Sequence, residues 1–338
     1  MRRRRRKRKE PMLLAVLCGL GCICIVLLLA IGFLFFKSHS IKDGAEKEDT
    51  VVTEEQSEEP KEAEAETDKE PLPEAETGLE IHFIDIGQGD ATLIKCDGYT
   101  MLLDTGSADP EARRSDRDLL EYLQENGVER LDILLLSHGH EDHMGRACDI
   151  LEAMEVGRVL CDFGNEEGYV QRLEQMLIDT EQEVVVPVQG DVYPLGDASV
   201  HILTGRLTEL GESETEIERV NNQSIGVKVV YGETSFLFYG DGDAGYEQYL
   251  LELNRDISAD VLKVPHHGAA VSCCEQILER VQPEYAVISS AKQEDFGFPS
   301  AEVLLRLTAQ QITTFYTNKQ GNIIAISDGE SISWTTRR

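Results

Sequence analysis

From residue 79 onward, the chain alternates short apolar runs with stretches of helical period. Residues 81–86 alternate in character and predict a strand, and Asp97-Gly98 predicts a hairpin between strands at 91–95 and 99–103. Other apolar runs predict strands at 131–136, 158–163, 183–188, 200–203, 225–230, 235–239, 261–264, 285–290, 312–317, 322–327 and 331–335. Apolar stripes at helical spacing predict helices from Ser115, as the cap, to Gly127, and at 145–154, 170–178, 244–253, 274–281 and 300–310.

These elements form two strand-rich halves, each interleaved with helices. Such an order predicts an α/β fold in which helices face two sheets, a four-layer sandwich. The acidic, aperiodic segment 206–219 predicts an exposed loop. Residues 79–338 can bury a large core without disulfides, so we expect their five cysteines to be small buried side chains: Cys96, Cys148, Cys161, Cys273 and Cys274.

The N-terminal part has a different character. Residues 1–11 hold a basic block, and residues 12–36 are 25 positions without a charge. At a rise of about 1.5 Å per residue this run exceeds the roughly 30 Å hydrocarbon core of a bilayer, so it predicts a single transmembrane anchor. The basic block predicts a cytoplasmic N-terminus and a folded domain outside the cell membrane. A cleaved signal peptide and a lipoprotein signal at Cys22 are the alternatives, and both lack the usual cleavage-site pattern.

Charge is distributed unevenly along the chain. Residues 37–78 carry 15 acidic and five basic side chains and no aromatic ring, which predicts a disordered acidic linker. Residues 1–10 carry eight basic side chains and one acidic one, so −28 of the net charge of −31 falls on residues 79–338. A domain this acidic repels DNA and other polyanions unless a basic or metal-bearing patch intervenes.

The segment from Ser137 to His143 carries the strongest sign of chemistry. It follows an apolar strand, and three of the chain's eight histidines fall within six of its residues. His138 and His140 can face one ion from a strand end, while Asp142 and His143 in the next turn can face a second. Imidazole and carboxylate ligands suit Zn, Mn or Fe. Two ions about 3.5–4 Å apart can hold a hydroxide at neutral pH and stabilise the oxygens of a displacement.

Two further polar clusters follow apolar strands. Asp241 lies in a Gly-Asp-Gly turn, where its carboxylate could bridge two ions, although such turns are also common as plain hairpins. His266 and His267 follow the strand 261–264, and such a pair is also common in loops and cores. Because all three clusters follow strand ends, we expect them to complete one site.

These motifs resemble a known family. The pattern runs from residues 81–90 (IHFIDIGQGD) through His138-x-His140-x-Asp142-His143 and Tyr239-Gly240-Asp241 to residues 262–268 (LKVPHHG). It resembles the metallo-β-lactamase superfamily and, more narrowly, the hydrolase domain of ComEC-type DNA-uptake (competence) proteins, over about residues 79–330. The resemblance implies an αββα fold and a dinuclear site for two divalent ions, Zn or Mn.

The resemblance also implies roles for individual residues. The implied metal ligands are His138 and His140 for one ion, Asp142 and His143 for the other, Asp241 as a bridge and His266 as the last histidine. The implied catalytic residues are Asp142 and His267, with His267 contacting substrate or donating a proton. Asn222 and Ser224 match an Asn-x-Ser motif of the subfamily and are candidates for substrate binding.

The chain departs from the family pattern at three points. Many superfamily hydrolases have another histidine ligand after the strand at 200–203, where this chain has Thr204-Gly205. His201 lies mid-strand and is expected to be structural, so the ion at His138 and His140 has fewer predicted ligands. Ala269 replaces the serine that usually follows His-His-Gly. ComEC-type proteins have many membrane spans, and one predicted span cannot form their channel.

The sequence therefore predicts a membrane-anchored, extracytoplasmic metal-dependent hydrolase of phosphodiesterase or nuclease type. Its expected partners are the membrane, through residues 12–36, and a phosphoester substrate, with DNA among the candidates. Two alternatives remain: a lactonase- or amidase-type hydrolase of a non-phosphate bond, and a non-catalytic binding module on a degenerate fold. The sequence leaves the substrate, the metal and the oligomeric state open.

Overall fold

A computed structural model describes residues 66–67, 78–113, 118–162, 168–207, 215–253, 255–292 and 297–337. The predicted anchor at 12–36 lies outside these residues, as does the predicted linker except for residues 66, 67 and 78. Within the described ranges, no helix is long and apolar enough to cross a membrane.

Two mixed sheets form the centre of the fold. In the described part, the order of the first sheet is β1 (Glu66–Thr67), β16 (Ile332–Arg337), β15 (Asn322–Ser327), β2 (Leu79–Phe83), β3 (Thr92–Cys96), β4 (Tyr99–Leu103), β5 (Arg130–Leu135), β6 (Glu155–Leu160) and β7 (Val184–Val185). The order of the second is β14 (Thr313–Tyr316), β13 (Tyr285–Ile288), β12 (Val261–Lys263), β11 (Thr234–Phe238), β10 (Gly226–Tyr231), β9 (Ala198–Thr204) and β8 (Val192–Leu195).

The first core lies between the two sheets. On β2, Leu79, Ile81 and Phe83 face this core, because alternate residues of a strand share a face. The ring of Phe83 stacks on that of Phe238 from β11, with centroids 6.0 Å apart. His82 lies on the other face of β2, and its Nδ1 shares a 2.8 Å hydrogen bond with the Tyr122 hydroxyl of helix 119–125.

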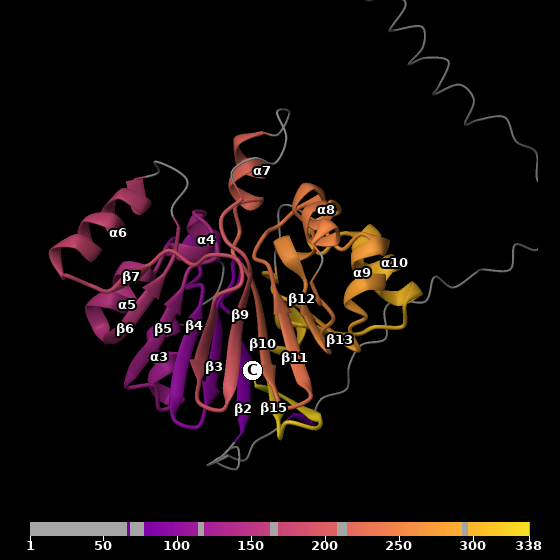
Figure 1. Ribbon diagram of the computed structural model, residues 1–338, viewed down its shortest axis with the longest axis horizontal. Coiled ribbons are helices and arrows are strands. Elements are labelled where there is room, and N and C mark those ends of the chain that lie inside the picture. The colour runs from indigo at the N-terminus through magenta and orange to yellow at the C-terminus, as the bar shows by residue number, and fades with distance from the viewer. Residues whose placement is uncertain are drawn as a thin grey trace, which may run out of the picture. The chain divides into compact units, whose positions relative to one another are not determined.

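Helices cover the outer face of each sheet (Figure 1). The helices over the first sheet are α3 (Leu119–Glu125), α5 (Ala147–Ala153) and α6 (Gly168–Asp179). Those over the second are α8 (Ala244–Glu252), α9 (Glu275–Val281) and α10 (Ala301–Ala309). The shorter helices are α2 (Pro110–Arg113), α4 (Glu141–Met144), α7 (Glu216–Asn221), α11 (Thr317–Gln320) and the 3₁₀ turn η1 (Pro265–Gly268). The predicted four-layer α/β sandwich is confirmed.

Several local predictions were wrong. Helix α7 begins inside the segment 206–219 that was predicted as a loop and continues to Asn221, and Thr215 and Glu218 form a capping box at its start. Asp118 caps α3 by accepting hydrogen bonds from the amides of Leu120 and Glu121, whereas the predicted cap Ser115 lies outside the described residues. Strand β8 was not predicted, β7 is shorter than expected, and the linker residues Glu66–Thr67 pair with β16. The free cysteines are buried as expected, except for half-buried Cys274.

The topology brings four strand ends to the same region. Strands β4 and β5 are parallel neighbours in the first sheet, and β11 and β12 are parallel neighbours in the second. The predicted ligands follow the C-terminal ends of β5, β11 and β12. Because the core packs the two sheets face to face, the ligands that follow these strands converge from both sheets at the C-terminal ends of the strands.

Candidate metal centre

The histidine segment is held in place by backbone contacts with the loops beside it. His138 and His140 lie in the loop after β5, and Asp142 and His143 lie in the short helix α4. The carbonyl of Asp142 accepts a 3.1 Å hydrogen bond from the amide of Asp90. Gly89 has φ +118°, and a Cβ there would overlap the Asp142 carbonyl, so this approach requires glycine.

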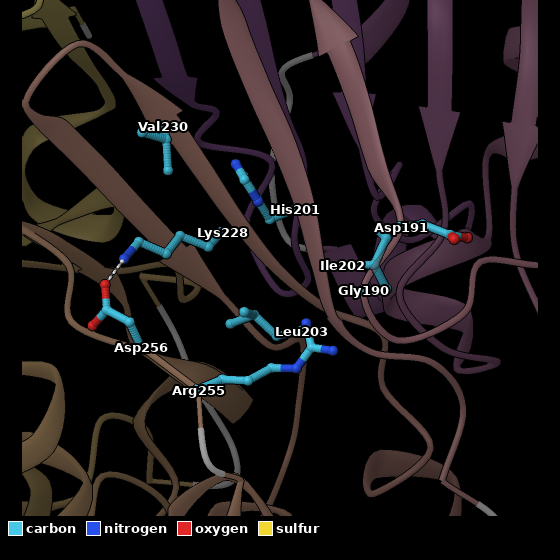
Figure 2. Close-up of a pocket in the computed structure, with 9 residues that line it drawn as sticks. All are labelled: Gly190, Asp191, His201, Ile202, Leu203, Lys228, Val230, Arg255 and Asp256. Atoms are coloured by element: carbon cyan, nitrogen blue, oxygen red, sulfur yellow. Dashed lines mark hydrogen bonds and ion pairs between the residues drawn. The ribbon is translucent and has the colours of Figure 1, made fainter.

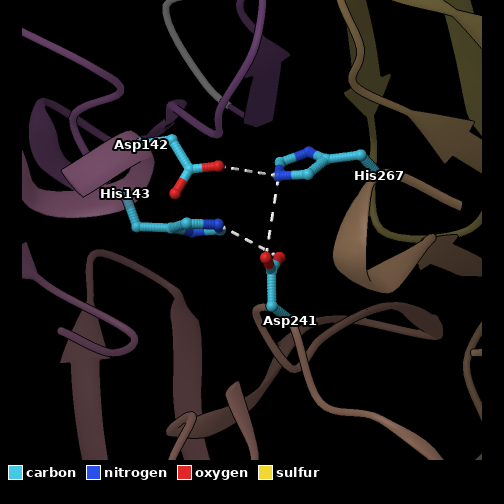
Figure 3. A group of neighbouring side chains, drawn as sticks. All are labelled: Asp142, His143, Asp241 and His267. Carbon is cyan, nitrogen blue, oxygen red and sulfur yellow. Dashed lines mark hydrogen bonds and ion pairs between the residues drawn. The ribbon is translucent and has the colours of Figure 1, made fainter. Parts of the chain in front are cut away.

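Four side chains form the first ligand group: Asp142, His143, Asp241 and His267, whose ligand atoms all lie within 4.8 Å of one another. Nε2 of His143 is 3.0 Å from Oδ1 of Asp241. Nε2 of His267 is 3.3 Å from Oδ2 of Asp142 and 3.7 Å from Oδ2 of Asp241. Figure 3 shows Asp142 and His143 approaching from the left, His267 from the right and Asp241 from below.

His138, His140 and Asp241 form a second ligand group. Nε2 of His138 is 3.1 Å from Nδ1 of His140. Asp241 therefore belongs to both groups and lies where one carboxylate can contact two ions. A third set consists of Asp90, Asp104 and His143, but Asp104 already accepts a hydrogen bond from His143 and Asp90 accepts one from Lys263.

The residues present fit a divalent metal ion. Nε2 of His143 and Oδ1 of Asp241 are buried and lie 3.0 Å apart, and apart from each other neither atom has a hydrogen-bond partner in the described part. Two atoms bound to one tetrahedral ion at about 2.0–2.2 Å lie about 3.3–3.6 Å apart, close to the separations in both groups. Imidazole and carboxylate donors without thiolate suit Zn, Mn or Fe. The cluster can therefore hold a metal ion.

A buried carboxylate orients one histidine of each group. Asp104 follows β4, and its Oδ2 accepts hydrogen bonds from Nδ1 of His143 (2.9 Å) and from the Ser137 hydroxyl (2.8 Å). The Ser137 hydroxyl lies 3.0 Å from Nδ1 of His138 and accepts a hydrogen bond from that nitrogen when the nitrogen carries a proton. Nε2 of both histidines then carries the free lone pair that a metal ligand needs.

His267 is oriented in a similar way. Its Nδ1 lies 3.1 Å from the carbonyl oxygen of Ser289 and donates to it, which leaves Nε2 facing the first ligand group. Asp90 lies 3.6 Å from the same nitrogen and forms a 2.7 Å ion pair with Lys263, two residues before the η1 turn. Both members of this pair are buried.

The electrostatics of the groups favour the ligand forms of several side chains. Burial opposes the charge of Asp241, but the positive charges of His143 and His267 outweigh it and hold the pKa of Asp241 well below its usual value. Burial, followed by the charge of His143, lowers the pKa of His138 well below its usual value. Neutral imidazole and ionised carboxylate are the forms that bind a metal.

His143 behaves differently from His138. Burial acts to lower its pKa, but the carboxylates of Asp241 and Asp104 raise the pKa well above its usual value. Without an ion, the two carboxylates therefore favour the protonated form of His143. An ion can bind Nε2 of His143 only after the proton on that nitrogen has left. We therefore expect ion binding at the first ligand group to release protons.

The η1 turn sends its two histidines in different directions. His266 (φ 48°) and His267 (φ 52°) are both left-handed, a conformation that non-glycine residues adopt at a cost of about 1–3 kcal/mol. His267 enters the first ligand group, whereas Nδ1 of His266 lies 2.8 Å from Oδ1 of Asp243. The sequence assigned the metal to His266 and catalysis to His267. The structure instead brings His267 together with the other ligands and leaves His266 outside both groups.

Asn222 and Ser224, the predicted substrate-binding residues, support the turn that carries Asp241. Oδ1 of Asn222 accepts a 2.9 Å hydrogen bond from the amide of Asp243. The Ser224 hydroxyl donates to the carbonyl of Asn221 (2.7 Å) and accepts from the amide of Asp241 (3.2 Å). Both side chains are buried. Their contact with substrate stays a prediction.

Sequence reasoning missed Asp104, Asp90, Asp243 and Asn221. Asp104 and Asp243 had a detectable signal, because each follows the end of a strand within a Gly-containing turn. Asp241 was selected because it follows an apolar strand in a turn with glycine, and the same reasoning would have selected Asp104 and Asp243. Nothing local in the sequence indicates that Asn221 contacts His266 while Asn222 contacts Asp243. The direction of each side chain depends on how α7 ends.

His201 lies away from the metal-binding groups, as expected. Its Nε2 lies 2.9 Å from the Ser199 hydroxyl, and its side chain lines a separate pocket with residues of β9, β10 and two loops (Figure 2). In that pocket, Lys228 donates a 3.0 Å hydrogen bond to Asp256. None of the predicted ligands lines this pocket.

The fold and the site define a two-sheet α/β protein with a candidate metal centre at the strand ends. The model of the metallo-beta-lactamase superfamily matches residues 84–292, and the chain belongs to this superfamily. The resemblance to ComEC-type competence proteins is also confirmed by curated relatives.

ComE operon protein 3 of Bacillus subtilis (strain 168) is 28% identical over 262 residues, which cover 72% of this chain and 32% of that protein. Recombination protein 2 of Haemophilus influenzae is 30% identical over 228 residues, 68% of this chain and 26% of that protein. Competence protein ComA of Neisseria gonorrhoeae is 28% identical over 253 residues, 75% of this chain and 32% of that protein. The chain thus spans about a quarter to a third of the length of these relatives.

His266→Ala and His267→Ala test which histidine of the pair holds the ion. We expect His267→Ala to weaken binding of one ion by more than about a hundredfold, beyond the 10–100-fold typical of residues that only orient a ligand. His266→Ala should keep the wild-type metal content, because the ring nitrogens of His266 face Asp243 and Asn221 and belong to neither ligand group. Zinc titration against a chromophoric chelator measures both. The reverse pattern would return the ligand role to His266.

Asp104→Asn tests whether one carboxylate orients both groups. Asparagine has one acceptor oxygen, so its NH2 group must face either the Ser137 backbone amide or the Ser137 hydroxyl and Nδ1 of His143, all of which are donors to Asp104. We therefore expect affinity to fall about 10–100-fold for each of two ions. The same chelator titration measures this loss. Asp256→Asn is the matched control, because Asp256 is mostly exposed and pairs with Lys228. Wild-type affinity at both sites in Asp104→Asn would show that this network does not orient the ligands.

Proposed function

We propose that the chain is a metal-dependent phosphodiesterase with a two-ion centre. The observation that carries the proposal is the place of Asp241 in both ligand groups. A carboxylate shared by two ions is suited to holding them about 3.5–4 Å apart, the spacing used by phosphatases and nucleases for in-line displacement at phosphorus. Aminopeptidases use the same spacing, so the choice of a phosphoester over an amide or lactone rests on the similarity to competence and recombination proteins.

In this proposal each ion has its own ligands. Asp142, His143 and His267 would hold one ion, His138 and His140 would hold the other, and Asp241 could contact both. The second ion then has three protein ligands, which is the usual number at a catalytic site that leaves a position for water or substrate. The small number of ligands predicted for the ion at His138 and His140 is therefore compatible with an active enzyme as well as with a degenerate, non-catalytic fold.

When bound, the two ions would supply an activated water and charge stabilisation at the phosphoryl oxygens. The chain's own groups fix where that chemistry occurs. Asp142 has a side chain 28% exposed, whereas those of His143, Asp241 and His267 are buried, so Asp142 is the ligand of the first group that faces incoming substrate. We assign to it the orientation of the attacking water. Asp104 and Ser289 keep the imidazoles from rotating as charge develops.

The substrate is narrowed by charge. The named relatives are competence and recombination proteins, which favours DNA as a candidate. The −28 charge of residues 79–338 opposes tight binding of a polyanion. A small phosphodiester carries fewer charges into the site and therefore fits this domain better.

The location follows from the N-terminal sequence. From the apolar run at 12–36 and the basic block before it, we infer an enzyme that is anchored to the membrane and acts outside the cytoplasm.

The purified full chain, loaded with Mn or Zn, tests this function on single-stranded DNA and on a small phosphodiester such as bis(4-nitrophenyl) phosphate. We expect turnover of the small diester, its loss with a chelator and its return with metal. Asp142→Ala should lower kcat/KM by about 10²–10⁴, the usual contribution of a positioned catalytic group. Asp256→Asn serves as the control and should keep wild-type activity.

Other outcomes would contradict parts of the proposal. No turnover of either phosphodiester by the metal-loaded chain would refute phosphodiesterase activity. Wild-type activity in Asp142→Ala would refute the assigned role of that residue. Preference for DNA over the small diester would show that local charge in the site outweighs the charge of the domain.

A further inference from the structure

A second polar cluster, formed by Asn221, Asp243 and His266, lies beside the metal-binding groups. Asn221 ends α7, Asp243 lies two residues after Asp241, and His266 directly precedes His267. Oδ1 of Asp243 lies 2.8 Å from Nδ1 of His266. Nδ2 of Asn221 approaches both ring nitrogens of His266 at 3.4 and 3.5 Å, which is long for a hydrogen bond. None of the three belongs to a ligand group of the described residues.

The cluster contains two buried acceptors that no described donor satisfies. They are Oδ2 of Asp243 and Oδ1 of Asn221, on residues that are 4% and 1% exposed. A buried polar atom without a partner costs about 1–3 kcal/mol, so most folded proteins satisfy nearly all of them. Two such atoms around one imidazole, next to a metal-binding group, indicate that a ligand supplies the missing hydrogens.

His266 is the member of the cluster that a ligand can reach. Its side chain is 20% exposed, against 6% for Asp243. Phe298 packs edge-on against its ring, with centroids 5.4 Å apart, and gives the cluster an apolar wall. The two atoms of the cluster that lack a described partner are both acceptors, one of them on a carboxylate.

We propose that Asn221, Asp243 and His266 form a substrate subsite that takes a free hydroxyl group on the alcohol part of the substrate, next to the scissile phosphate. A hydroxyl donates to such acceptors, whereas a second phosphate would be repelled by the Asp243 carboxylate. The inference rests on the proposed phosphodiesterase function and makes its substrate class narrower.

The subsite distinguishes small phosphodiesters from the interior of DNA. Within a DNA strand, both hydroxyl oxygens of every deoxyribose are esterified, so an internal linkage offers no free hydroxyl beside it. A small diester of a sugar or polyol keeps one. The cluster thus favours the same class of substrate as the charge of the domain, from an independent observation.

A matched pair of substrates tests the subsite in the full chain loaded with Mn. The pair is thymidine 5′-(4-nitrophenyl phosphate) and its 3′-deoxy analogue, which differ by one hydroxyl and release the same chromophore. We expect kcat/KM to favour the hydroxyl-bearing substrate about 10- to 100-fold, the usual effect of a hydrogen bond to a charged group. In Asp243→Asn this ratio should fall to within about threefold, while two ions remain bound.

Controls separate a lost contact from a damaged fold. Asn221→Ala should also lower the ratio and serves if Asp243→Asn does not fold, as judged by circular dichroism. Asp256→Asn, on the separate pocket, should keep the wild-type ratio. A wild-type ratio near one, or an unchanged ratio in both cluster variants with metal bound, overturns the subsite and leaves the phosphodiesterase intact. Turnover of neither substrate by the wild-type chain overturns both proposals.

Discussion

The buried carboxylate of Asp104 is the constraint on which the metal centre depends. It follows β4, is fully buried, and accepts hydrogen bonds from Ser137 and from Nδ1 of His143. Through the Ser137 hydroxyl it also reaches His138. One side chain thus sets the orientation of a histidine in each ligand group. Burial raises the pKa of this carboxyl, and the charge of His143 opposes the shift, so the acid and the histidine stabilise each other. Removal of either partner would leave the other buried without compensation.

The packing of the two sheets makes this local network into a site. The ligands after β5 come from the first sheet, and Asp241 and His267 come from the second. The core between the sheets, with Phe83 stacked on Phe238, fixes their separation. Two contacts near the site also cross the interface: the amide of Ile225 donates to the carbonyl of Ser137, and Lys263 pairs with Asp90. The centre therefore needs the whole sandwich, and neither half alone holds a complete ligand set.

The sequence predicts much of this arrangement, because strand periodicity and strand-end motifs are local signals. The layered fold, the segment from His138 to His143 and the turn at Asp241 all follow from such signals. The assignment of His266 and His267 does not, because it depends on two left-handed residues in η1 that turn adjacent imidazoles apart. The supporting role of Asn222 and Ser224 likewise depends on how α7 ends above the Asp241 turn. These features arise from tertiary packing, which residue spacing does not encode.

Asp241 is the residue that we propose two ions share. Anomalous diffraction from crystals of the Mn- or Zn-loaded protein measures this directly. We predict two peaks about 3.5–4 Å apart, with Asp241 between them, His267 at one and His138 and His140 at the other. A single peak, or a peak held by His266 in place of His267, would contradict this prediction.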